Sequence, residues 1–224
     1  MTTGPAAQSP RRRGRPPTGV RESVLAATEA ILAESGVARL STKEVASRAA
    51  VAESSIFYHF RDRLGLLRAV VEAQLPPIHR LLTELHEGGG QGSVRADLIA
   101  LLDTLEAFYL RTMPVAAAIQ SDGQLRLAFA QQHRDLDVGP HRALQAVHVY
   151  LDEQRRRGRL SGHGDLRAAA LLLVGAAHQR ALQRQFGTPA TLADLPSTAD
   201  AVDLLLPLLA AAPDQEGPPR AERA

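Results

Sequence analysis

Apolar residues recur at helical spacing along most of the chain. Spacings of three, four and seven residues join Val24, Ala27 and Ile31, and they predict a helix over 20–35. No segment shows the strict alternation of a half-buried strand. The fold class is therefore predicted to be all-α, with about nine helices: three short N-terminal helices and then a larger helical body. The same pattern places the later helices over 41–49, 53–59, 62–86, 93–112, 115–121, 124–136, 140–157, 165–186 and 197–212.

Several helix boundaries carry a chemical signal. Ser41 and Glu44 have the spacing of a capping box, in which the serine oxygen accepts from an orphan backbone N–H. Asp165 and Ser197 are expected to cap the starts of the last two helices, and Gly158 is expected to end the helix before them.

Prolines are expected to interrupt the helical pattern at two places. Pro76 and Pro77 remove backbone hydrogen bonds inside 62–86, so a kink or break is predicted there. Pro114 is predicted to end one helix and to start the next.

Two short helices near the N-terminus are separated by the three-residue turn 50–52, which predicts a helix-turn-helix. Ile56 and Phe60 of the second helix are expected to face the core. The adjacent Tyr58 and His59 cannot point inward with them, so they present a hydroxyl and an imidazole outward. These groups suit phosphate oxygens and base edges, and contact with DNA is favoured over an ordinary solvated helix.

Charge is unevenly distributed along the chain, although the net charge is only +2. Residues 1–63 carry ten Lys and Arg against six Asp and Glu, so a polyanion would meet this end first. Residues 1–17 lack apolar periodicity and are predicted to form a disordered arm, and 213–224 a disordered tail. The arm is expected to contact a minor groove or phosphates, against the alternative of a solvated tail, through Arg11, Arg12, Arg13 and Arg15.

The motif around the second and third helices consists of Val45-Ala46, Ala49, Val51, Ile56 and Tyr58-His59-Phe60. With this spacing, the stretch 21–70 resembles the N-terminal DNA-binding domain of the TetR family of bacterial transcriptional regulators. The resemblance implies a DNA-binding domain over 18–78, with its helix-turn-helix at 41–60. It also implies a ligand-binding and dimerisation domain over 79–212.

The resemblance further implies which side chains meet DNA. The hydroxyl at the start of the second helix would bind a phosphate, and the third helix would enter the major groove. The residue at the start of the fourth helix would pair with a phosphate by charge. The implied contacts are Thr42, Lys43, Glu53, Ser54, Ser55, Phe57, Tyr58, His59 and Arg63.

Three residues depart from the family pattern. Phe57 stands where a tyrosine is usual, so one hydroxyl is missing. Ala50 replaces the usual turn glycine, so the turn either needs no positive φ or is somewhat strained. Glu53 replaces a common lysine, and its carboxylate repels phosphate and can accept only from a base donor such as cytosine N4.

One helix-turn-helix offers few base contacts, so a two-fold dimer that reads a palindrome is expected. The resemblance implies that helices 165–186 and 197–212 pair across the dyad to form a homodimer, whereas the alternative is that they only fill the monomer core. It also implies a pocket for a small-molecule effector. The residues able to line such a pocket are Phe108, Tyr109, Met113, Phe129, His133, His148 and His178.

Other classes of function find little support in the sequence. There is no cysteine, and the histidine pairs lack a metal-binding motif, so neither a metal nor a cofactor is expected. No nucleophile, Walker or dinucleotide motif is present, which argues against an enzyme. No apolar stretch approaches the roughly 20 residues of a membrane span, and a cytoplasmic protein is expected.

The prediction is thus a sequence-specific transcriptional regulator, most simply a repressor released from a palindromic operator by a small molecule. The alternative is a helical ligand-binding or scaffold protein whose DNA binding is weakened or lost.

Overall fold

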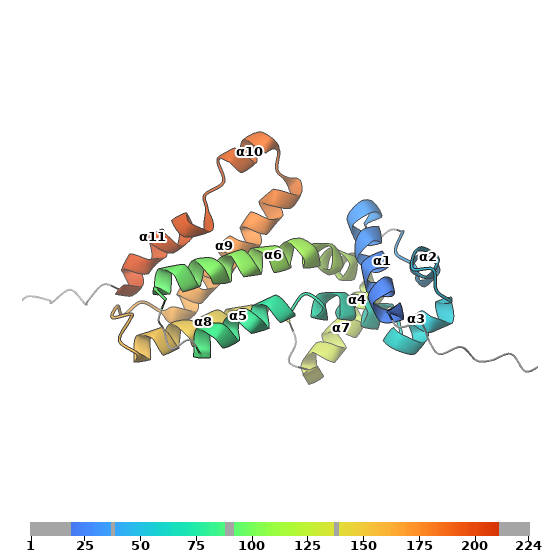
Figure 1. The fold of residues 1–224 in the computed structure, drawn as a ribbon, viewed down its shortest axis with the longest axis horizontal. Coiled ribbons are helices and arrows are strands. Elements are labelled where there is room, and N and C mark those ends of the chain that lie inside the picture. The colour runs from blue at the N-terminus through green and yellow to red at the C-terminus, as the bar shows by residue number, and fades with distance from the viewer. Residues whose placement is uncertain (1–18, 37–38, 88–91, 137–138, 211–224) are drawn as a thin grey trace, which may run out of the picture. The chain divides into compact units, whose positions relative to one another are not determined.

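The computed structural model describes residues 19–36, 39–87, 92–136 and 139–210. These residues form eleven α-helices and no strand, which confirms the all-α fold class (Figure 1). The chain divides into two compact units, and the boundary falls between Leu67 and Arg68, inside α4 (Arg63–Glu72). The predicted domain limits, 18–78 and 79–212, stay a prediction.

The N-terminal unit is built from α1 (Val20–Ser35), α2 (Thr42–Arg48), α3 (Glu53–Phe60) and the start of α4. Its centre is apolar: Val24, Val45 and Ile56 are fully buried, one from each of the first three helices. The serine half of the predicted capping box is present, since Ser41 Oγ accepts from the backbone N–H of Glu44 at 3.1 Å. Helices α2 and α3 form the predicted helix-turn-helix.

The turn between α2 and α3 places a non-glycine residue in the left-handed region. Ala50 has φ 54°, and its N–H donates to Ser47 O while that of Val51 donates to Ala46 O. This is the Schellman arrangement, in which glycine normally takes the position of Ala50. Of the two possibilities left by the sequence, the strained turn is the one found. Arg61, directly after α3, also has a positive φ of 68°.

The larger unit contains α5 (Pro76–Glu87), α6 (Val94–Ser121), α7 (Gly123–Leu136), α8 (His141–Arg156), α9 (Leu166–Phe186), α10 (Pro189–Ala193) and α11 (Thr198–Ala210). Helix α9 packs against α6, α8 and α11, and α6 also packs against α5, α7 and α11. The apolar core lies where these helices meet, with Leu98, Leu102, Leu151 and Leu173 among its members. Helix α10 contributes no buried residue.

Most predicted helix ends are confirmed. Asp165 caps α9 by accepting from the N–H groups of Arg167 and Ala168, and these backbone hydrogen bonds lower the pKa of its carboxyl. Ser197 and Asp200 bond reciprocally at the start of α11: the N–H of Ser197 donates to the Asp200 carboxylate, and the N–H of Asp200 donates to Ser197 Oγ. The break at Pro76–Pro77 separates α4 from α5.

One expectation is corrected, and one helix was missed. Pro114 does not interrupt its helix: it lies inside α6, which continues to Ser121. A proline removes only one helical N–H, and Thr112, Val115 and Ala118 around it are buried, so packing holds both halves in line. Helix α10 was not predicted. The described residues form eleven helices, whereas about nine were expected.

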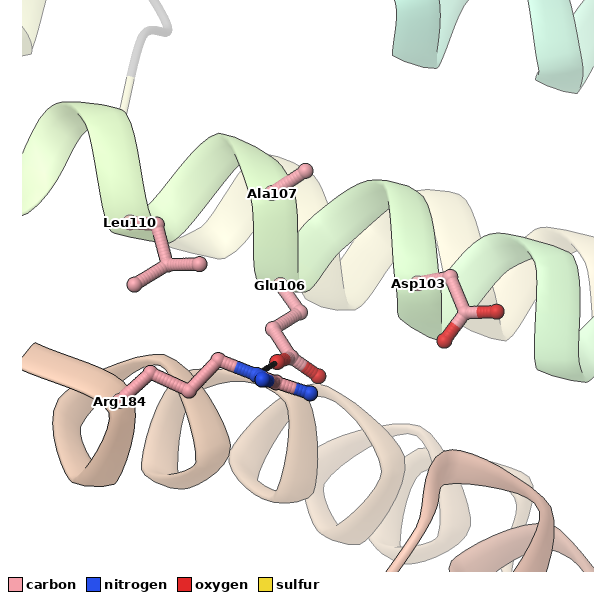
Figure 2. A pocket seen from close by; sticks show the side chains of 5 residues that line it. All are labelled: Asp103, Glu106, Ala107, Leu110 and Arg184. Atoms are coloured by element: carbon pink, nitrogen blue, oxygen red, sulfur yellow. Dashed lines mark hydrogen bonds and ion pairs between the residues drawn. The ribbon is translucent and has the colours of Figure 1, made fainter. Parts of the chain in front are cut away.

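A charged group lies between α6 and α9. The side chain of Glu106 is only 7% exposed, and its Oε2 accepts from Arg180 Nε at 2.7 Å. The guanidinium of Arg184 contacts the other carboxylate oxygen from the outer side (Figure 2). Arg180 also donates to the carbonyl of Pro196, just before α11. Both buried charges therefore have partners, as buried charges require.

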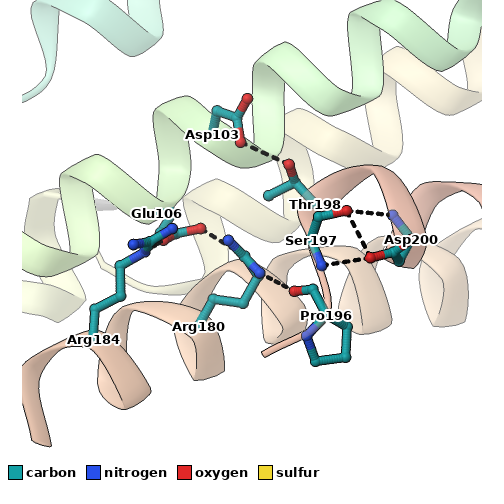
Figure 3. A network of polar contacts seen from close by, with 8 residues as sticks. All are labelled: Asp103, Glu106, Arg180, Arg184, Pro196, Ser197, Thr198 and Asp200. Carbon is teal, nitrogen blue, oxygen red and sulfur yellow. Dashed lines mark hydrogen bonds and ion pairs between the residues drawn. The ribbon is translucent and has the colours of Figure 1, made fainter. Parts of the chain in front are cut away.

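Further polar contacts join α6 to the last helix. Asp103 Oδ1 accepts from the hydroxyl of Thr198 at 2.8 Å (Figure 3). Near the start of α6, Arg95 Nε donates to Asp203 Oδ1 at 2.6 Å. One side of α6 thus makes two direct polar contacts with α11, and Glu106 is linked to the segment before α11 only through Arg180 of α9.

The positive φ of Ala50 generates a stability prediction. Ala50→Gly removes the steric cost of the left-handed conformation and should raise the free energy of unfolding by about 0.5–1 kcal/mol, net of the added freedom of the unfolded chain. The matched control is Ala49→Gly, because Ala49 has φ −78°. That variant should lower stability by a similar amount. Urea unfolding followed by circular dichroism measures both, and a destabilised Ala50→Gly protein would contradict the prediction.

The Glu106–Arg180 pair generates a second stability prediction. Glu106→Leu leaves a buried guanidinium without its main carboxylate partner and should cost about 3–5 kcal/mol of unfolding free energy. Adding Arg180→Met should recover much of that loss, because the unpaired charge is then gone. Both are measured by urea unfolding at one protein concentration.

The control for this cycle is Asp203→Asn, which breaks a pair exposed by nearly half on each side and should change stability little. Equal losses in the single and double variants would show that the unpaired charge is not the cause.

Candidate nucleic-acid interface

One side of α3 carries the polar and aromatic groups predicted to read DNA. Tyr58 is 84% exposed and Phe57 is 50% exposed, whereas Ile56 and Phe60 are buried as predicted. Three further predicted contacts, Glu53, Ser54 and His59, are exposed, and Ser55 is half-buried. The helix therefore presents hydroxyl, carboxylate, imidazole and aromatic groups on the outside of the N-terminal unit.

The aromatic end of α3 is ordered by ring contacts. The rings of Tyr58 and His59 meet edge to face, with centroids 5.1 Å apart. The guanidinium of Arg21 lies 5.7 Å from the centroid of Phe60, within the range of a cation–π contact. The buried Phe60 thus anchors the end of the helix, and Tyr58 projects from it.

The structure brings together two predicted contact residues that sequence reasoning treated separately. The hydroxyl of Thr42, at the start of α2, donates to Glu53 Oε1, at the start of α3, over 2.5 Å. Both side chains were predicted to meet DNA, one at a phosphate and the other at a base. The two positions are eleven residues apart, and no sequence pattern indicates that they bond.

The basic residues near α3 differ in exposure and in pairing. Lys43 is exposed and Arg63 is half-buried. Arg48, which was not predicted to have a role, forms a two-pronged ion pair with Glu34 that joins α2 to α1. The hydrogen bond from Arg48 lowers the pKa of the Glu34 carboxyl. The predicted arm contacts Arg11, Arg12, Arg13 and Arg15 lie outside the described residues.

The residues predicted to line an effector pocket lie on four helices of the larger unit. Tyr109 on α6 is half-buried, its ring meets that of His178 on α9 edge to face at 5.0 Å, and burial raises its pKa. Nδ1 of His148 on α8 is buried and lacks a hydrogen-bond partner among the described residues. The other predicted residues are Phe108, Met113 and Phe129, which are half-buried, and His133, whose side chain is not among those described.

A shallow pocket of about 280 Å³ lies elsewhere, between α6 and α9. Its lining consists of Asp103, Glu106, Ala107, Leu110 and Arg184 (Figure 2). None of the seven predicted effector residues lines it, so their assignment stays a prediction.

Helices α9 and α11 expose large apolar side chains. On α9, Leu171 and Leu172 are 59% and 57% exposed, and a Cβ on Gly175, one turn further along, would meet nothing within 4 Å. On α11, Leu204 and Leu208 are 74% and 65% exposed and lie one turn apart. Neighbouring apolar residues of the same helices are buried within the chain, namely Ala169, Ala170, Ala177, Ala181, Val202 and Leu209. The two helices therefore fill the monomer core on one side and leave apolar surface on another.

None of the described helices has the length and apolarity that a membrane crossing requires. No three acidic or histidine side chains of the described residues come together as metal ligands would.

Comparison with known proteins bears directly on this interface. Residues 24–70, which include α2 and α3, match the family model described as bacterial regulatory proteins, tetR family. The chain matches no curated protein.

Solved structures extend the likeness beyond the helix-turn-helix. A TetR-family transcriptional regulator from Mesorhizobium loti has a TM-score of 0.63 at 19% identity, over 88% of this chain and all of that one. The triclosan complex of SmeT has a TM-score of 0.56 at 25% identity, over 84% of this chain and 90% of that one.

NalD, the secondary repressor of the MexAB-OprM multidrug efflux pump in Pseudomonas aeruginosa, is also similar. Its TM-score is 0.54 at 18% identity, over 84% of this chain and 93% of that one. The fold shared with these proteins therefore covers most of the chain.

Proposed function

We propose that this chain, whose residues 24–70 match the tetR family model and most of whose length shares the fold of such regulators, is a DNA-binding transcriptional repressor that acts as a homodimer. It binds a palindromic operator in the cytoplasm through two copies of α3, and a small molecule releases it. The proposal involves no catalytic step and no cofactor. The competing function is that of a helical ligand-binding or scaffold protein with weakened DNA binding, which the departures at Glu53 and Phe57 favour.

The exposed side of α3 is the observation that carries this proposal. Tyr58 is 84% exposed, so its ring stays in contact with water until a partner covers it, and it lies beside serine, histidine and carboxylate groups. Side chains of these kinds reach base edges and thymine methyl groups when such a helix enters the major groove. The arginines at 11, 12, 13 and 15 are proposed to follow the minor groove or the phosphates.

A homodimer is proposed through α9 and α11. The exposed leucines of these helices form apolar surface of the kind that protein interfaces cover. The open space above Gly175 would let a partner helix approach closely. Two-fold symmetry then presents two reading helices to the two halves of a palindrome.

The effector is proposed to be a small, mainly apolar molecule. The structure of SmeT with triclosan is an example of such a complex on this fold. Among the residues proposed to contact the effector, His148 has a buried ring nitrogen that a hydroxyl of the ligand would satisfy. Any such molecule must favour the arrangement of the dimer that cannot bind the operator.

Selection from random duplexes tests the DNA-binding proposal. The purified protein is expected to enrich a palindrome, and Tyr58→Ala should weaken binding to it by about tenfold or more through lost base or phosphate contacts. The matched control is Leu127→Ala on α7, a 60% exposed residue outside the proposed interfaces. It should leave binding unchanged. The scaffold function is favoured instead if the protein enriches no sequence.

Charge placed on the exposed leucines tests the dimer. Leu208→Asp should raise the dimer dissociation constant on the order of 100-fold, because an unpaired carboxylate would be buried at the contact. Leu127→Asp introduces the same charge at an equally exposed leucine and should leave the dimer intact. Sedimentation equilibrium measures both, and the proposed contact is rejected if the two variants behave alike.

A further inference from the structure

The Thr42–Glu53 hydrogen bond assigns a specific role to a residue that departs from the usual pattern. Resting on the proposed function, we propose that Glu53 is a specificity-determining residue. Its carboxylate suppresses binding to the DNA backbone and accepts from an exocyclic amine of a base, cytosine N4, in each half-site.

Glu53 suppresses binding to the DNA backbone in part because the Thr42 hydroxyl has only one hydrogen to donate. A threonine hydroxyl donates one hydrogen bond, and here that hydrogen is directed to Glu53 Oε1 at 2.5 Å. A phosphate oxygen can accept it only after the carboxylate gives it up. The residue predicted to hold a phosphate is therefore already occupied by an anionic group of the protein itself.

The charge of Glu53 acts in the same direction. Glu53 is exposed on the reading side of α3, and no Lys or Arg among the described residues forms an ion pair with it. Arg48, the last residue of α2, is paired with Glu34 instead. A carboxylate at this position repels the phosphates of every sequence equally, so it lowers affinity for non-specific DNA.

Base recognition uses the second oxygen of the same carboxylate. The Thr42 bond fixes Oε1 and leaves Oε2 as an acceptor at the first turn of α3, where a recognition helix contacts base edges. A carboxylate only accepts, which suits the donor-only N4 group of cytosine. It cannot also donate to N7 of adenine or guanine as an amide or guanidinium does. The proposed preference is therefore for cytosine.

A double-mutant cycle tests whether Glu53 suppresses non-specific binding. It measures the affinity of each variant for a duplex that lacks the selected palindrome. Glu53→Ala should raise affinity for this duplex about fivefold at moderate salt. Adding Thr42→Val should reduce that gain to about twofold, because the released hydroxyl is then missing. Thermal melting confirms that each variant is folded. Glu22→Ala removes one exposed carboxylate from α1 of the same unit and should change affinity little.

An equal gain from Glu53→Ala with and without the Thr42 hydroxyl would overturn the proposed suppression. A gain of the same size from Glu22→Ala would overturn it as well, because the effect would then be that of net charge.

Selection from random duplexes tests base recognition. The unmodified protein should prefer cytosine at one base pair of each half-site, and Glu53→Ala should reduce the discrimination there about tenfold without changing the other positions. Unchanged discrimination at every position would overturn the assignment of Glu53 while leaving the proposed regulator intact. Failure of the unmodified protein to select any sequence would overturn the proposed function itself.

Discussion

The packing of α9 against α6 is the contact on which the larger unit depends. Small buried residues on α9, such as Ala170 and Ala177, let its backbone approach the core, and α8 and α11 then pack on α9 in turn. Apolar contacts of this kind are strong but non-directional. The Glu106–Arg180 pair fixes the register of α6 against α9, because burying either charge without the other is costly.

The two turns at residues 50 and 158 show how the same backbone geometry is reached with different residues. Gly158 has φ 74°. The hydrogen bonds that end α8 there follow the same pattern as those that end α2 at Ala50. Glycine adopts this conformation freely, whereas alanine does so at a steric cost. Among the described residues, the only non-glycines at positive φ are Ala50 and Arg61, and α3 lies between them. The backbone strain of the unit is thus concentrated at the two ends of α3.

Local chemistry made much of this fold predictable from the sequence. The caps at Ser41, Asp165 and Ser197 depend on residues within three positions of one another, so a short pattern reveals them. The exposed face of α3 was predictable because adjacent aromatic residues cannot share one side of a helix. Pro114 was misjudged because packing, which acts over long distances in sequence, decides whether a helix tolerates a proline. Helix α10 buries no residue, so it leaves no apolar period to detect.

Pairs distant in sequence were the part that could not be predicted. Glu106 follows the apolar Leu102 by four residues, and Arg180 follows Ala177 by three. This helical spacing indicates that both charged side chains face the core. That spacing does not say that they meet each other across 74 residues.

The polar contacts of α6 have a consequence for the proposed dimer. Apolar packing alone would allow α11 to slide along α6 at modest cost, and the exposed leucines of α11 would slide with it. Three polar contacts oppose this movement. Two join α6 to α11, namely the Arg95–Asp203 pair and the Asp103–Thr198 hydrogen bond, and the third joins Arg180 of α9 to the carbonyl of Pro196 before α11. Each depends on distance and angle, so a shift of one helical turn would break all three. A dimer that must hold two reading helices at a fixed spacing needs its own interface held in register, and directional polar contacts supply what apolar burial cannot.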